Sequence, residues 1–212
     1  MAVELECKLA VADHESVRER LRASGAVRLC CVLERNRLFD DERKSLLAAG
    51  CGLRVRDIRV LDGDPAAAPA TLTFKGPVLP GPFKRREEIE MPIGDADAMA
   101  RLLEALGYRP WIAFEKRRES WRLPGDVPGA EAAGDSRAAE PAASGGCVVE
   151  LDELPRLGCF VEVEGPTHDA IRRALFALGL DPAGCIRQGY PALVAECAGG
   201  DGPFALTFPP GS

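Results

Sequence analysis

Apolar and charged residues alternate with a period of two in many short segments of this chain. The first segment is VELECKLAV (3–11), in which Glu4, Glu6 and Lys8 stand between apolar residues. Side chains two positions apart on a β-strand point to the same side, so this pattern predicts a strand with one charged and one apolar face. Similar patterns predict further strands over 27–41, 50–62, 71–77, 83–93, 111–123, 147–154 and 158–165.

Three segments are predicted to form helices: 13–26, 95–108 and 167–180. The first two begin near Asp13 and Asp95, and glycines stand near their ends, which is typical of helix termini. The strands are closely spaced, which indicates antiparallel hairpins, and about eight strands are enough to close a barrel. The predicted fold class is therefore α+β, an eight-stranded antiparallel closed β-barrel with flanking helices.

The chain is predicted to form a single domain over residues 1–197. A Pro/Gly/Ala/Ser-rich stretch over 124–146 separates two predicted strands of a hairpin, so we expect a mobile loop insertion rather than a domain boundary. Residues 181–196 are expected to form a short terminal element. The remaining residues, 198–212, are expected to be a flexible tail.

Composition excludes some functional classes. The 212 residues are 46% hydrophobic and 28% charged, with a formal net charge of -6, which argues against a general nucleic-acid binder. No apolar run reaches the length of a membrane span, and no secretory leader is recognisable, so we expect a soluble cytoplasmic protein. The eight cysteines form no CxxC pair and the chain has only two histidines, so a Cys/His zinc site is poorly supported.

Charged residues of the predicted strands gather on shared faces. Besides the set on 3–11, these groups are Arg54 with Arg56, Thr73 with Lys75, Lys84 with Arg86, Glu88 and Glu90, Lys116 with Arg118, Glu150 with Asp152, and Glu162 with Glu164. For any one strand, the simplest explanation is a sheet with one face toward water. If the strands close on themselves while helices cover the apolar faces, the charged faces instead point into the barrel, where they need partners or a ligand.

The two signs of charge suggest one kind of ligand. Paired carboxylates suit Mg²⁺ or Mn²⁺, which prefer oxygen ligands, and arginines and lysines suit phosphate oxygens. A site that contains both is what a metal-bound polyphosphate needs.

The charged motifs of these predicted strands resemble those of a known family. Residues 4–8 (ELECK) match the ExExK signature of the CYTH superfamily, the triphosphate tunnel metalloenzymes that include class IV adenylate cyclases and thiamine triphosphatases. Further similar motifs follow in the same order: LRVR (53–56), TFKGP (73–77), KRREEIE (84–90), EKRRESW (115–121), VELDELPRLGCFVEVEG (149–165) and QGYPALVAE (188–196). The resemblance covers nearly all of residues 2–196.

The resemblance implies a tunnel that binds a small-molecule triphosphate together with Mg²⁺ or Mn²⁺. It implies metal ligands at Glu4, Glu6, Asp152, Glu162 and Glu164, and triphosphate-binding roles for Lys8, Arg54, Arg56, Lys75, Arg86, Lys116 and Arg118. Glu6 and Lys8 are the expected catalytic residues, and the expected supporting residues are Glu88, Glu90 and Glu150. A homodimer is left open as the oligomeric state.

The reaction has two alternatives. A cyclase converts ATP to cyclic AMP and pyrophosphate, whereas a triphosphatase hydrolyses a nucleoside, thiamine or inorganic triphosphate, and both use the same metals and basic residues. A non-catalytic module that binds polyphosphate or nucleotide is a third alternative, and a purely structural lattice of salt bridges is a fourth.

The histidines and tryptophans are predicted to have structural roles. His14 and His168 are expected to have capping or surface roles, and Trp111 and Trp121 are expected to pack in the core. Tyr190 falls where cyclase-like members carry a Ser-Tyr pair, but Gly189 departs from that pattern, so Tyr190 is assigned no role at the tunnel mouth.

Overall fold

The computed structural model describes residues 2–62, 69–125, 146–199 and 203–209. Its strands are β1 (Ala2–Val11), β2 (Val27–Asp40), β3 (Gly52–Asp62), β4 (Ala70–Lys75), β5 (Lys84–Ile93), β6 (Arg109–Leu123), β7 (Cys147–Leu154), β8 (Gly158–Glu164) and β9 (Phe204–Leu206). Its helices are α1 (Glu15–Ala23), α2 (Ser45–Ala48), α3 (Ala96–Ala105), α4 (His168–Ala177) and α5 (Tyr190–Ala198), with a short 3₁₀ turn, η2 (Pro182–Gly184).

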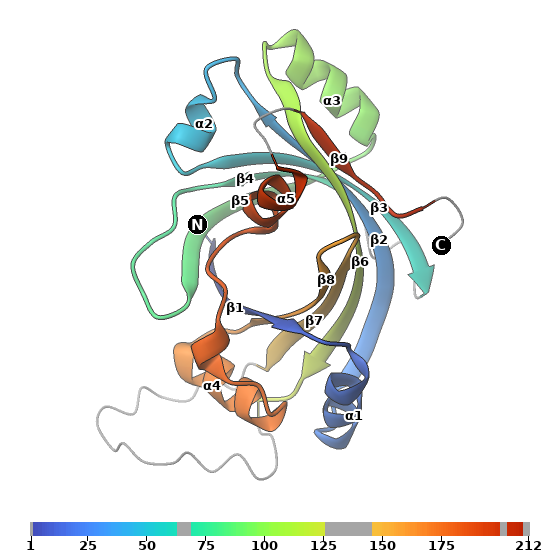
Figure 1. Ribbon diagram of the computed structural model, residues 1–212, viewed down its shortest axis with the longest axis vertical. Helices are drawn as coiled ribbons and strands as arrows, with labels where there is room; N and C mark the ends of the chain where they lie inside the picture. Colours follow the sequence, from blue (N-terminus) through green and yellow to red (C-terminus); the bar gives the residue numbers. More distant parts are fainter. Residues whose placement is uncertain (1, 63–68, 126–145, 200–202, 210–212) are drawn as a thin grey trace.

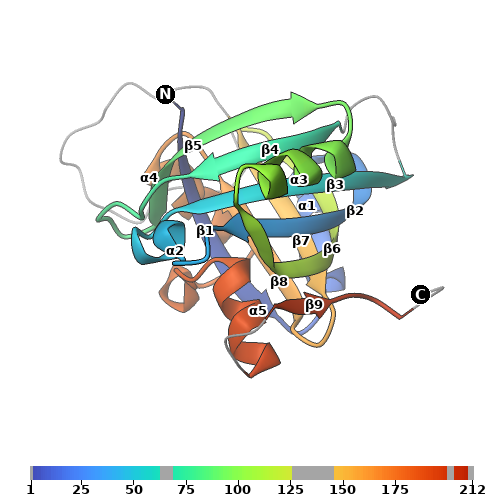
Figure 2. The same cartoon turned by 90° about the horizontal axis from the view of Figure 1, so that it is seen from above.

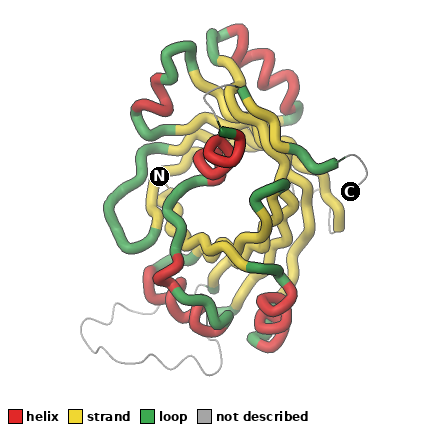
Figure 3. The backbone as a smooth tube through the Cα atoms, viewed as in Figure 1, coloured by secondary structure: helices red, strands yellow, loops and turns green. Residues whose placement is uncertain are grey.

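The first eight strands close into an antiparallel barrel. Neighbours follow the order β2-β3-β4-β5-β1-β8-β7-β6, and a long pairing of β6 with β2 completes the ring. Figures 1 and 3 show the ring of strands around a central interior. The predicted fold class, an eight-stranded antiparallel closed barrel with flanking helices, is confirmed.

Apolar side chains pack outside this ring as well as inside one end of it. The largest cluster joins β1, β6, β7 and β8 to α1 and α4, with Cys7, Val149 and Val163 fully buried. A second cluster packs α3 on β2, β3 and β4, and Figure 2 shows α3 lying along these strands. A third, which includes Phe114, Phe160 and Tyr190, packs α5 against β6, β8 and β9. The helices α1, α3 and α4 therefore cover outward apolar faces of the strands, whereas α5 packs on inward-facing apolar residues at one end of the barrel.

Two of the predicted helices have clear N-caps. The side chain of Asp95 accepts hydrogen bonds from the backbone N–H groups of Asp97 and Ala98 at the start of α3, and Thr167 accepts from Ala170 at the start of α4. These caps explain why both helices begin where the sequence predicted.

Three short elements were not predicted. The helix α2 spans only four residues, and α5 begins within the terminal element expected over 181–196 and continues to Ala198. The tail that was expected to be flexible contains β9, which pairs in parallel with Ile112–Phe114 of β6. The predicted 124–146 loop lies almost entirely outside the described residues. Among the described residues, no helix is both long enough and apolar enough to cross a membrane.

Candidate active site

The barrel encloses a cavity of about 1000 Å³. Eight lysines and arginines and eight glutamates line it, and they come from all eight barrel strands. Every predicted triphosphate-binding residue is among them, so the structure brings Lys8, Arg54, Arg56, Lys75, Arg86, Lys116 and Arg118 into one cavity. The predicted acidic residues also line it, except Asp152, which is completely buried next to it. The charged faces thus point inward, as the closed-barrel alternative predicted.

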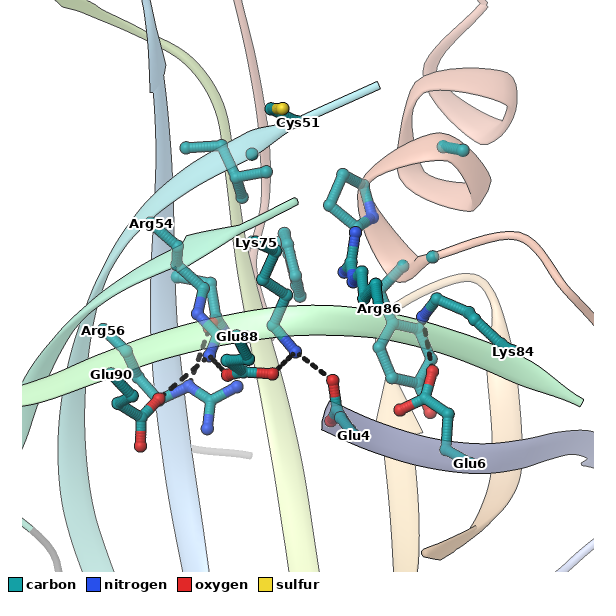
Figure 4. Close-up of a pocket in the computed structure, with 18 of the residues that line it drawn as sticks. Glu4, Glu6, Cys51, Arg54, Arg56, Lys75, Lys84, Arg86, Glu88 and Glu90 are labelled. Carbon is teal, nitrogen blue, oxygen red and sulfur yellow. Dashed lines mark hydrogen bonds and ion pairs between the residues drawn. The ribbon is translucent and has the colours of Figure 1, made fainter. Parts of the chain in front are cut away.

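Figure 4 shows the wall formed by β1, β3, β4 and β5. Lys75 Nζ lies 2.9 Å from Glu4 Oε2 and 2.6 Å from Glu88 Oε2, so one ammonium bridges two carboxylates. Glu6 and Lys84 form a separate ion pair on the adjacent part of the wall. The residue pairing of β1 with β5 produces this arrangement, because Glu6 stands directly opposite Lys84.

The opposite wall centres on a buried carboxylate, Glu34 of β2, whose exposed fraction is 2%. Its oxygens lie 3.0 Å from Arg56 Nη1 and 3.3 Å from Lys116 Nζ. Burial alone would raise the pKa of Glu34, but Arg56, Lys116 and Arg118 outweigh it and hold that pKa well below its usual range. Glu34 is therefore ionised, and it fixes three cations on one side of the cavity.

Arg118 and Lys116 also hold Asp152. Arg118 Nε donates to Asp152 Oδ1 at 2.7 Å, and Lys116 Nζ donates to Asp152 Oδ2 at 3.1 Å. Arg118 makes further ion pairs with Glu150 and Glu162. One guanidinium thus neutralises carboxylates from two neighbouring strands, β7 and β8.

Lys8 lies where β1, β8 and α5 meet. Its Nζ is 3.3 Å from Glu162 Oε1, donates to the backbone oxygen of Gln188 at 2.9 Å, and lies 3.9 Å from the centre of the Tyr190 ring. Burial lowers the pKa of Lys8, although the charge of Glu162 acts in the opposite direction. The Tyr190 hydroxyl donates to Asp152 at 2.7 Å, so this tyrosine touches the charge network although the sequence assigned it no role.

Two guanidinium groups carry unused hydrogen-bond donors. The Nε atoms of Arg54 and Arg86 are buried and have no acceptor among the described residues. Desolvation and the neighbouring charge of Arg56 lower the pKa of Arg54 to about 10. These donors line the cavity, where an anionic ligand can satisfy them.

Carboxylates gather in two groups around the cavity, and among the described residues only the first group has its oxygens close enough together to hold a divalent cation. Oxygens of Glu150, Asp152 and Glu162 all lie within 4.8 Å of one another. The second group is Glu164 with Glu4 and Glu6, and Glu6 faces Glu164 directly in the pairing of β1 with β8.

Each carboxylate group contains one carboxyl with a raised pKa. Desolvation raises the pKa of Glu150 to about 7, and desolvation together with the charges of Glu4 and Glu6 raises that of Glu164 to about 7. All-oxygen donor sets suit Mg²⁺ or Mn²⁺.

Sequence reasoning missed several residues of the cavity. Glu34 and Asn36 were not selected because Arg35 and Arg37, on the opposite face of β2, look like another basic pair. Arg35 and Arg37 instead point outward to Glu115 and Asp97. Lys84 was predicted to share a face with Arg86 but was left out of the site. Its position two residues before Arg86 was the available signal that it also lines the cavity. For Tyr190 the strand pattern gives no signal, because this residue begins a helix.

Other expectations need correction. His14 occupies the N-cap position of α1, but its side chain makes no capping bond and is buried, with its Nε2 3.0 Å from the backbone oxygen of Phe160. His168 stacks on Phe83 with 5.6 Å between the ring centres. Trp121 packs in the core as expected, and the partly buried Trp111 packs against the cluster around α5 and also lines the cavity.

A closed antiparallel barrel with an interior of paired cations and carboxylates defines a class of tunnel proteins suited to polyanions and metals. The CYTH domain profile matches residues 2–176. Because this match covers most of the chain, the protein belongs to the CYTH family.

The relatives agree in length with this chain. A "putative adenylate cyclase" from Methanocaldococcus jannaschii is 24% identical over 197 residues, covering 89% of this chain and 96% of the relative. The PH1819 protein from Pyrococcus horikoshii has a similar fold, with a TM-score of 0.66 and 24% identity over 91% of this chain and 98% of that one. The "putative adenylyl cyclase" HpAC1 from Hippeastrum, described as revealing a dominant triphosphatase activity, gives a TM-score of 0.59 at 18% identity, covering 94% and 96%.

Proposed function

We propose that this protein hydrolyses a triphosphate held inside the barrel, with Mg²⁺ or Mn²⁺ as cofactor. The observation that carries the proposal is the pair of unsatisfied buried donors, Arg54 Nε and Arg86 Nε, on a cavity wall lined by further cations. A buried donor without an acceptor costs free energy, and phosphate oxygens supply acceptors of the right charge. The triphosphatase activity stated for the Hippeastrum relative is consistent with this proposal.

The basic residues bind the phosphate chain in this proposal. Lys75, Lys116 and Arg118 are each paired with carboxylates in the ligand-free protein. Binding of a triphosphate exchanges part of these ion pairs for contacts with phosphate oxygens, while Arg86, which has no ion pair among the described residues, gains an anionic partner. The carboxylates Glu88 and Glu90 keep Lys75 and Arg54 oriented toward the cavity.

Carboxylates around the cavity would hold the metal. Glu4, Glu6 and Glu164 form one candidate ligand group, and Asp152 and Glu162, with Glu150 beside them, form the other. A bound divalent cation neutralises phosphate charge and lowers the pKa of a coordinated water. Lys8, buried between Glu162 and Tyr190, presents its ammonium to the phosphate chain and stabilises charge on the phosphate that leaves.

Cyclisation of ATP is the second candidate. Leu47, Trp111 and Pro191 line the cavity beside the charged walls, and such an apolar surface can hold a nucleoside next to the bound triphosphate. The name of the Methanocaldococcus relative agrees with this alternative. The two reactions differ in which phosphorus is attacked and in the products.

Product analysis tests the proposal. The protein is incubated with inorganic tripolyphosphate, ATP or thiamine triphosphate, with Mg²⁺, with Mn²⁺ or with EDTA. Metal-dependent release of orthophosphate supports hydrolysis, whereas cyclic AMP and pyrophosphate from ATP select the cyclase. Substrate binding without any product would instead identify a non-catalytic binding module and reject both reactions.

Two variants test the site. Glu6→Gln removes a proposed metal ligand, so most of the metal-dependent activity should be lost. Glu87→Gln changes an outward-facing carboxylate of the neighbouring strand β5 and should leave the activity unchanged. Equal activity of the two variants would contradict the proposed place of the metal.

A further inference from the structure

Two cysteine thiols meet on the outer side of the β1 strand. Cys7 alternates with the inward-facing Glu6 and Lys8, so its side chain points away from the cavity into the apolar cluster under α1 and α4, where it is fully buried. Cys185 follows the η2 turn, is half-buried, and packs against the same cluster. Cys7 and Cys185 thus belong to the same packed region on the outer side of β1.

The backbone holds these two cysteines side by side. The N–H group of Ile186 donates to the carbonyl oxygen of Lys8 at 2.7 Å. On the other side of Cys185, Gly184 approaches β1 so closely that an added Cβ would lie 3.2 Å from Leu9 Cδ2. The residues that follow Cys7 and Cys185 are therefore hydrogen-bonded to each other, so the two cysteines stand on adjacent backbones, the arrangement in which a disulfide can form.

We propose that Cys7 and Cys185 form a reversible intramolecular disulfide that fastens the start of the α5 helix to β1. In the first step the more accessible Cys185 thiolate attacks a low-molecular-weight disulfide such as oxidised glutathione, forming a mixed disulfide and releasing one glutathione thiolate. The Cys7 thiolate then attacks the Cys185 sulfur and releases the second glutathione thiolate. The two cysteines are oxidised, the glutathione disulfide is reduced to two thiols, and the two protons pass to these thiols.

The link has a structural consequence at the cavity. Residues 186–189 connect Cys185 to α5, and within this connector the carbonyl oxygen of Gln188 accepts the hydrogen bond from Lys8. Gly189 and Tyr190, at the end of the connector, line the cavity. A covalent bond at Cys185 therefore restrains the segment that covers this part of the cavity, while the thiols themselves remain outside it.

Mass spectrometry of the whole protein tests the proposal without reference to its catalytic activity. The protein is equilibrated with oxidised glutathione, free thiols are alkylated, and the protein is digested without reductant. We expect a cross-linked peptide pair containing Cys7 and Cys185, which disappears after dithiothreitol. The oxidised protein should also unfold at a higher temperature than the reduced protein, because the cross-link restricts the unfolded chain.

Matched variants separate this pair from general thiol oxidation. Cys185→Ser should abolish both the cross-linked peptide and the rise in unfolding temperature, whereas Cys159→Ser, at another half-buried cysteine, should retain both. Cys7→Ala, which removes the buried partner of the pair, should likewise abolish both. The proposal is overturned if both cysteines remain alkylatable after oxidation, if Cys185 stops at the mixed disulfide with glutathione, or if Cys185 pairs with another cysteine.

Discussion

At the scale of single residues, Arg86 differs from the other cations of the cavity. Its Nε has no acceptor among the described residues, whereas Lys75, Lys84, Lys116 and Arg118 all have carboxylate partners. Removing Arg86 therefore breaks no ion pair that the structure describes. Its proposed contribution is to the ligand-bound state.

We predict that Arg86→Ala weakens tripolyphosphate binding without loss of folding stability. A hydrogen bond to a charged group contributes about 1.5–3 kcal/mol, which corresponds to a roughly ten- to hundredfold higher dissociation constant. Calorimetric titration of the metal-loaded protein measures this change. Arg85→Ala, an exposed arginine on the outer face of the same strand, is the control, and equal affinities in the two variants would contradict the proposed role.

Glu34 differs from Arg86, because Glu34 is expected to stabilise the ligand-free fold. Replacing it by Gln leaves Arg56 and Lys116 facing each other without a buried carboxylate between them. We predict that Glu34→Gln lowers the free energy of unfolding by about 3–5 kcal/mol, as expected for one partner of a buried ion pair. Urea unfolding measures this loss.

A surface pair gives the comparison for Glu34. Glu153 pairs with Arg117 and is 44% exposed, so Glu153→Gln should change the free energy of unfolding by less than about 1 kcal/mol. Tripolyphosphate should restore part of the stability of Glu34→Gln, because it replaces the missing negative charge. A loss as small as that of Glu153→Gln would show that Glu34 does not hold the buried cations.

The raised pKa values of Glu150 and Glu164 predict a pH dependence. Each carboxyl has a pKa of about 7 in the folded protein, against 4.5 without the fold. Between these values the folded state binds more protons than the unfolded state, so the stability of the metal-free protein should fall as pH rises from 5 to 7. The lowered pKa values of Glu34 and Glu162 act below pH 4.5 and leave this window unchanged.

Urea unfolding at several pH values measures this slope. Saturating Mn²⁺ should flatten it, because the metal takes the place of the protons, and Glu150→Gln should remove part of it. A stability that rises from pH 5 to pH 7 in the metal-free protein would contradict the environment described for these carboxyls.

At the scale of elements, the alternation of side chains predicted the eight barrel strands because the two faces differ so strongly in polarity. It failed within β2, where the outward Arg35 and Arg37 are as polar as the inward Glu34 and Asn36. The short elements α2 and β9 were missed for another reason. Four or three residues are too few to show a period, and tertiary contacts decide their structure.

The β9 strand also carries a prediction of its own. Leu206 is buried in the cluster beneath α5, so Leu206→Ala should lower the free energy of unfolding by about 2–3 kcal/mol. Phe176→Ala is the control, because this large side chain on α4 is 69% exposed, and its loss should cost less than about 0.5 kcal/mol. Urea unfolding of both variants shows whether β9 contributes to stability, and equal values would mean that it does not.

At the scale of the whole molecule, the cavity carries a small excess of formal negative charge. Eight lysines and arginines face eight glutamates and Asp40, and Asp152 adds a buried negative charge beside them. A bare triphosphate would bring several further negative charges into this enclosed space. A divalent cation that enters with the triphosphate compensates for them, so we infer that the two ligands bind cooperatively.

This inference gives a quantitative prediction. Tripolyphosphate should bind at least about tenfold more weakly in EDTA than with Mn²⁺, and linkage requires that tripolyphosphate increase the affinity for Mn²⁺ by the same factor. Both titrations are measured by calorimetry, with the formation of the metal–tripolyphosphate complex in free solution subtracted. Glu4→Gln and Glu6→Gln should reduce the coupling, because they remove carboxylates that a metal needs. If tripolyphosphate binds equally tightly in EDTA, the basic wall alone holds it, and the carboxylates serve only to orient the cations.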